Sequence, residues 1–110
     1  MRNEYNRKTH DEAVVSIASQ IGANYGDRKH GVNLPQSPTI NGHIPDLMNG
    51  NDIYEIETSD SIDSDHTYGQ LSAWVSNGHN VAVYVPYGYA GIAAQQLAKW
   101  NLNTVRIGEY

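Results

Sequence analysis

Residues 80–86, Asn-Val-Ala-Val-Tyr-Val-Pro, constrain the fold more than any other part of the sequence. Residues 81–85 are all apolar, so a strand formed here would be apolar on both faces. Such a strand is typical of a sheet covered by helices on both sides. A helical pattern follows at Ile92, Ala93, Leu97 and Trp100, and Thr-Val-Arg-Ile at 104–107 reads as a last strand. Strand, helix and strand at this length form a right-handed crossover with parallel strands, which predicts an α/β fold.

Two further helices are expected upstream. Apolar residues recur at helical spacing after Thr9, and Gly26 stands where this first helix would end. The second helix should lie within 61–77, because Ser and Asp crowd its start, where carboxylates suit the helix dipole, and Gly78 follows its end. The apolar faces consist of Ala13, Val14, Ile17, Ala18 and Ile21 in the first helix and of Tyr68, Leu71, Trp74 and Val75 in the second.

A β-hairpin is predicted between these helices, at residues 43–57. His-Ile-Pro-Asp-Leu-Met and Asp-Ile-Tyr-Glu-Ile-Glu-Thr flank Asn49-Gly50-Asn51, and this turn chemistry is typical of hairpins. Residues 26–42 are rich in Gly and Pro and read as a loop with one strand near Val32 or Ile40. We therefore expect a single domain over 1–110, with a mixed sheet flanked by helices.

Composition narrows the possible functions. The chain of 110 residues has no cysteine, so thiolate metal sites are excluded and any metal must take oxygen or nitrogen ligands. No apolar run is long enough to span a membrane, and the polar N-terminus is unlike a secretory signal, so we expect an intracellular, cytoplasmic protein. The net charge of −5 argues against non-specific coating of nucleic acid. Local cations remain, either as ordinary surface charges or near a site: Arg2, Arg7, Lys8, Arg28, Lys29 and His30.

Acidic residues gather on one face of the predicted hairpin. Side chains alternate along a strand, so Glu55 and Glu57 share a face. A two-residue loop at Gly50-Asn51 places Asp46 opposite Glu55, and a loop at Asn49-Gly50 places it opposite Ile53; both put Asp46 on the Glu55 face. Three carboxylates this close repel one another, and a Mg²⁺ or Mn²⁺ ion would relieve the repulsion. The alternative is an ordinary hairpin with polar residues on its solvent-exposed face.

The pattern Ile-Pro-Asp at 44–46, a turn, and Glu55-Ile56-Glu57 resembles the signature of the PD-(D/E)xK superfamily of nucleases, which includes restriction endonucleases, Holliday-junction resolvases and RecB-like exonucleases. The family core consists of a helix, a three-stranded meander, a helix and a strand, and this chain would add a helix and a strand at its C-terminal side. Gln70 and Trp74 are similar to the Q-x-x-x-Y element of the RecB-like branch, with Trp replacing Tyr. Glu57 stands where the family usually has Lys.

The resemblance implies roles for the matching residues. Asp46, Glu55 and the backbone carbonyl of Ile56 would bind Mg²⁺ or Mn²⁺, and Glu57 would orient the attacking water or hold a second ion. Gln70 would hydrogen-bond a phosphate oxygen or a ligand carboxylate. The implied function is metal-dependent hydrolysis of DNA phosphodiester bonds, by a homodimer if both strands are cut, as in the family's resolvases. The alternative is a catalytically silent domain of the same fold that binds nucleic acid or a partner protein.

Removing either Asp46 or Glu55 should relieve their mutual repulsion, so metal-free stability is expected to stay level or rise in both variants.

Two other residues were candidates for the site. Glu12 could complete it from the first helix, but Thr9-x-x-Glu12 is also a capping box, which is the interpretation we favour. His66 lies one turn before Gln70 and could approach a phosphate, but a surface position at the start of the helix is the interpretation we favour.

Overall fold

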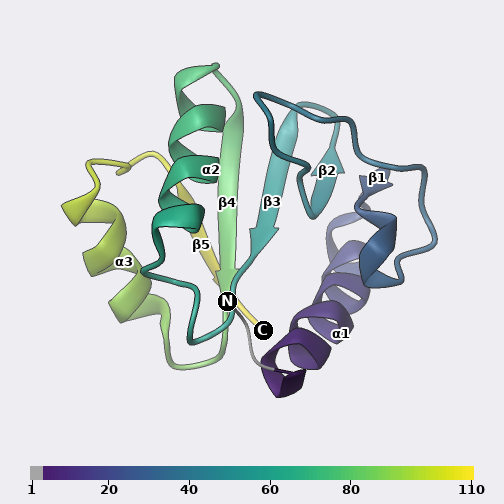
Figure 1. Cartoon of the computed structure of the whole chain (residues 1–110), viewed down its shortest axis with the longest axis horizontal. Helices are drawn as coiled ribbons and strands as arrows, with labels where there is room; N and C mark the ends of the chain where they lie inside the picture. Colours follow the sequence, from purple (N-terminus) through teal and green to yellow (C-terminus); the bar gives the residue numbers. More distant parts are fainter. Residues whose placement is uncertain (1–3) are drawn as a thin grey trace.

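The computed structural model describes residues 4–110 as three layers around a five-stranded mixed sheet (Figure 1). Helix α1 (Glu4–Ile21) covers one face, and α2 (Asp65–Ser76) and α3 (Ala90–Lys99) cover the other. The strands lie in chain order, and the short 3₁₀ helix η1 (Arg28–His30) follows the first of them. Their bounds are β1 (Tyr25–Gly26), β2 (Leu47–Asn49), β3 (Asp52–Ile56), β4 (Asn80–Val85) and β5 (Arg106–Glu109).

The sheet changes from antiparallel to parallel at β3. Strands β1, β2 and β3 form an antiparallel meander, whereas β3 pairs with β4, and β4 with β5, in parallel. The parallel pairs are connected by α2 and α3, which is the crossover arrangement that the apolar run at 80–86 predicted. The predicted α/β class with a mixed sheet and flanking helices is confirmed for the described residues.

Two apolar cores form, one on each face of the sheet. Leu71 and Trp74 of α2 pack with Ile53, Val81 and Val83 on one face. Residues of α1 pack on the other face with the strand residues Leu47 and Ile56 and with Val32: they are Ala13, Val14, Ile17 and Ala18. Consecutive residues of β4 are therefore buried on opposite faces, which explains why its sequence is continuously apolar.

The first helix is longer at its start and shorter at its end than predicted. It begins at Glu4, so Thr9 lies in its interior and the predicted capping box with Glu12 is wrong. Glu12 is exposed and its carboxylate lies 3.9 Å from the Lys8 ammonium instead. The helix ends before Gly22, whose φ of +64° is the left-handed conformation that favours glycine at helix ends. Gly26, the predicted stop, belongs to β1.

Residues 26–42 contain no strand beyond Gly26, so the strand expected near Val32 or Ile40 is wrong. Isolated bridges join Gly26 to Gln36 and Ile40 to His43, and Val32 is buried against α1 without strand pairing. The hairpin is also shorter than predicted. Its strands cover residues 47–49 and 52–56.

The pairing of Asn49 with Asp52 makes Gly50-Asn51 the two-residue turn, the first of the two registers considered. Asp46 therefore lies just before β2 and Glu57 just after β3. None of the described helices is both long enough and apolar enough to cross a bilayer.

Candidate metal centre

A cavity of about 220 Å³ opens at the end of the sheet where β3 finishes and β2 begins. It brings together residues from η1, the segment just before β2, strand β3, the 57–64 connection and the first turns of α2. Its lining includes Asp46, Glu55, Glu57 and Gln70, the four side chains that the sequence had singled out. The remaining polar residues in the lining are Asp27, Lys29, His30, Asp60, Ser61, Ser64, His66 and Thr67.

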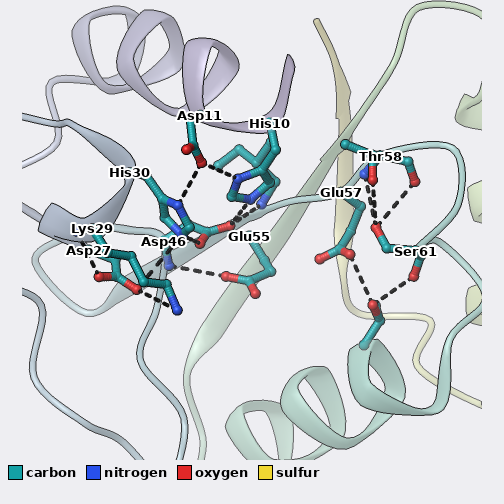
Figure 2. A network of polar contacts seen from close by, with 12 residues as sticks. His10, Asp11, Asp27, Lys29, His30, Asp46, Glu55, Glu57, Thr58 and Ser61 are labelled. Atoms are coloured by element: carbon teal, nitrogen blue, oxygen red, sulfur yellow. Dashed lines mark hydrogen bonds and ion pairs between the residues drawn. The ribbon is translucent and has the colours of Figure 1, made fainter. Parts of the chain in front are cut away.

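Asp46 is buried and lies just before β2 (Figure 2). The hairpin register brings it beside Glu55, whose Oε1 accepts a hydrogen bond from the Asp46 N–H at 3.1 Å. The Asp46 carboxylate accepts a hydrogen bond from the Ile56 N–H at 2.9 Å, through Oδ2. Ile56 thus contacts Asp46 through its N–H, and its side chain is fully buried on the α1 face.

Two histidines approach the same carboxylate: His30, which the sequence analysis noted only as a local cation, and His10, which it did not consider. His10 Nε2 lies 3.1 Å from Asp46 Oδ2, and His30 Nε2 lies 3.2 Å from Asp46 Oδ1. Burial alone would raise the pKa of Asp46, but the hydrogen bonds and charges of these two imidazoles outweigh it and hold that pKa well below its ordinary value. The ionised form of Asp46 is therefore stabilised in the folded protein.

Asp11 lies behind both imidazole rings. Its Oδ1 is 3.0 Å from His10 Nδ1 and 2.7 Å from His30 Nδ1, and Figure 2 shows the two rings lying between Asp11 and Asp46. One carboxylate thus orients the Nδ1 side of each ring and another faces the Nε2 side. His10, His30 and Asp46 each offer a ligand atom, and these atoms lie within 4.8 Å of one another.

Glu55 has the opposite electrostatic character to Asp46. It is buried, and burial together with the charges of Asp46 and Glu57 raises its pKa well above its ordinary value, although the hydrogen bond from the Asp46 N–H partly opposes this. A proton or a cation on Glu55 would remove the repulsion. The three carboxylates predicted to share a face thus line one cavity. The repulsion expected among them raises the pKa of Glu55, whereas the pKa of Asp46 is lowered.

Glu57 lies across the cavity from the histidines (Figure 2). The Thr67 hydroxyl donates to its Oε1 at 2.9 Å, and the Glu57 N–H donates to the Tyr84 carbonyl at 2.8 Å. Thr67 belongs to the first turn of α2, where Ser64 is the N-cap. The start of α2 therefore holds Glu57 in place from outside the sheet.

Gln70 and Leu71 point to different surroundings, as expected for neighbours on a helix. Gln70 lines the cavity, whereas Leu71 is almost completely buried in the α2 core. Trp74 is fully buried and its Nε1–H donates to the Ile40 carbonyl at 3.0 Å, so its role is in the core. His66 lines the cavity beside Gln70.

Of the local cations noted in the sequence, Lys29 and His30 line the cavity, and Arg2 lies outside the described residues. His10, Asp11 and Asp27 are site residues that sequence reasoning missed. Asp27 is buried, and its Oδ2 lies 3.6 Å from the Lys29 ammonium and 3.8 Å from His30 Nε2.

In comparisons with family models, curated proteins and solved structures, nothing matches this chain. The interpretation of the site therefore depends on its own geometry.

Proposed function

We propose that this protein is a metal-dependent phosphodiesterase that hydrolyses DNA, built on a restriction-endonuclease-like core. The observation that carries the proposal is the convergence of Asp46, Glu55, Glu57 and Gln70 on one cavity. The element order supports it, because a helix, a meander, a helix and a strand precede α3 and β5, which is the order that the PD-(D/E)xK resemblance implies.

The donor set fits a hard divalent cation. Glu55 combines a buried carboxylate with a strongly raised pKa, and the charges of Asp46 and Glu57 contribute to that shift. Mg²⁺ and Mn²⁺ accept such oxygen ligands and retain waters. Asp46 and Glu55 would hold the ion, with the Ile56 carbonyl as the further ligand that the resemblance implies. When bound, the cation lowers the pKa of a water molecule and offsets negative charge at the phosphate.

The other lining residues suit a phosphodiester. Lys29 and Gln70 are donors that line the cavity and would hold phosphate oxygens, and residues of the N-terminal turn of α2, where the helix dipole is positive, line the same space. Glu57, oriented by the Thr67 hydroxyl, would accept a hydrogen bond from the attacking water. A homodimer would let two such sites reach both strands of a duplex.

One observation favours a second candidate, a catalytically silent domain that binds nucleic acid or a partner protein. Both oxygens of Asp46 already lie within 3.2 Å of imidazole nitrogens, and Glu57 is almost completely buried. Such contacts would also serve a purely structural polar cluster. The two candidates differ in whether a cation binds to Asp46 and Glu55 or whether these carboxylates keep only their present partners in the protein.

Plasmid nicking separates the candidates. The full chain should convert supercoiled DNA to the open circle with Mg²⁺ or Mn²⁺ and not with EDTA, and Glu55→Gln should abolish this. Asp52→Asn is the matched control, because Asp52 lies on the same strand but bonds Asn80 at its other end. Absence of cleavage by the folded parent protein with either metal would favour the silent domain. Equal cleavage by the parent and Glu55→Gln would reject the proposed site.

A further inference from the structure

We propose that His10, His30 and Asp46 form a binding site for a first-row transition-metal ion such as Zn²⁺, distinct in chemistry from a magnesium site. This inference does not depend on the proposed function, because it rests on the ligand chemistry of these side chains. The starting observation is that a nitrogen from each imidazole and a carboxylate oxygen lie within 4.8 Å of one another, where His10 and Asp46 are buried and His30 is partly exposed.

The contacts of the two imidazoles suit a cation at this spot. Asp11 Oδ1 lies 3.0 Å from His10 Nδ1 and 2.7 Å from His30 Nδ1, and a proton on each Nδ1 would hydrogen-bond to it. The Nε2 atom of a neutral ring then carries a lone pair, and it would point this lone pair at the Asp46 carboxylate 3.1–3.2 Å away. That contact is repulsive unless a proton sits on each Nε2 or a cation lies between them.

A single dication supplies the same charge as two protons without making two cationic rings. The ring centroids are only 4.5 Å apart, so two imidazolium ions here would repel each other at close range. One metal ion would instead accept the lone pairs of both Nε2 atoms and a carboxylate oxygen together. The Asp11 carboxylate would then be the outer partner that fixes the tautomer of metal-binding histidines in many proteins.

The ligand types select the metal. Imidazole nitrogen suits Zn²⁺, Co²⁺, Ni²⁺ and Fe²⁺, whereas Mg²⁺ prefers oxygen and keeps its waters. Two nitrogens and one carboxylate leave coordination positions for water or a substrate atom. Asp27 Oδ2 lies 3.8 Å from His30 Nε2 and offers an additional carboxylate, and His30 and Asp46 line the cavity, which provides a route of entry.

Calorimetric titration of the metal-stripped full chain, free of any histidine tag, with Zn²⁺ tests the proposal. One equivalent should bind in a large excess of Mg²⁺, and Co²⁺ should give visible absorption bands in the same site. His30→Gln should abolish this binding. Asp11→Asn leaves all three ligands in place and should weaken it by about 10- to 100-fold. His66→Gln is the matched control, since His66 lines the same cavity but does not belong to the group of three converging ligands.

Each variant needs a circular dichroism spectrum like that of the parent, and Asp11→Asn keeps the test decisive if His30→Gln fails to fold. Glu55→Gln should stop DNA cleavage yet leave Zn²⁺ binding within a few fold, which distinguishes this site from the proposed magnesium site. Zn²⁺ binding that is absent in the parent, unchanged in both His30→Gln and Asp11→Asn, or lost equally in His66→Gln would overturn the proposal.

Discussion

Asp46 and Glu55 touch each other, yet their neutral variants should change stability in opposite directions. Asp46→Asn removes the charge that two imidazoles and the Ile56 N–H stabilise, so it should destabilise the metal-free protein. Glu55→Gln removes a carboxylate whose ionisation is opposed by burial and by its acidic neighbours, and Gln can still accept the Asp46 N–H. Metal-free stability should therefore stay level or rise.

The expected loss for Asp46→Asn follows from its surroundings. Breaking a buried ion pair by removing one partner costs about 3 to 5 kcal/mol, because the remaining charge stays buried. For a domain of this size, that corresponds to a fall in Tm of roughly 12 to 20 °C. The expectation from the sequence alone, that removing Asp46 would relieve repulsion, reverses here because it omitted His10 and His30.

Urea denaturation at neutral pH in EDTA, followed by tryptophan fluorescence, measures both variants, since Trp74 is fully buried. Asp52→Asn serves as the control and should lie within about 0.5 kcal/mol of the parent, as expected for a surface change. The reasoning fails if Asp46→Asn is as stable as the parent, or if Glu55→Gln loses as much as Asp46→Asn. The first result would mean that the imidazoles do not stabilise the Asp46 charge, and the second that the Glu55 carboxylate contributes to stability despite its burial and acidic neighbours.

Three further predictions follow from particular contacts. The pKa of Glu55 is raised in the folded protein, so above about pH 4.3 the folded state binds more protons than the unfolded state. Metal-free stability should therefore fall as the pH rises through the folded pKa of Glu55. In a series of urea midpoints measured at different pH values, Glu55→Gln should flatten this fall. Gly108→Ala would place a Cβ 2.5 Å from the Tyr84 ring and should cost about 1 to 3 kcal/mol, measured as a lower Tm. Trp74→Phe leaves the Ile40 carbonyl without its indole donor and should cost about 1 to 3 kcal/mol by urea denaturation, whereas an unchanged midpoint would show that water replaces the donor.

The parts of the fold that the sequence predicted well are those in which a local pattern and its tertiary environment agree. Strand β4 was predictable because its residues are apolar on both faces, and both faces are covered. A hairpin turn within Asn49-Gly50-Asn51 was predictable because Gly50 adopts a left-handed φ of +59°, which its residue type favours. Residues 26–42 were not predictable, because isolated bridges and burial of Val32 leave no periodic signal.

The acidic side of the site was predictable for the same reason. Alternation along β3 and a two-residue turn fix where Asp46 and Glu55 stand relative to each other, with no information from distant segments. Neither rule gives the charge state of a carboxylate. The charge state depends on residues that are distant in the chain: His10, which contacts Asp46, lies 36 positions before it.

His10 nevertheless left a signal in the sequence. Positions 10, 13, 14 and 17 lie on one face of a helix, and three of them are the apolar residues that defined the buried face of α1. Placing the helix start at Thr9 put His10 in a frayed first turn, whereas a start at Glu4 makes it a buried residue of the second turn. A histidine that continues an apolar helix face must be satisfied by polar partners once it is buried. Asp11 and Asp46 are those partners, so an error of a few residues at the helix start concealed one of the two imidazoles that contact Asp46.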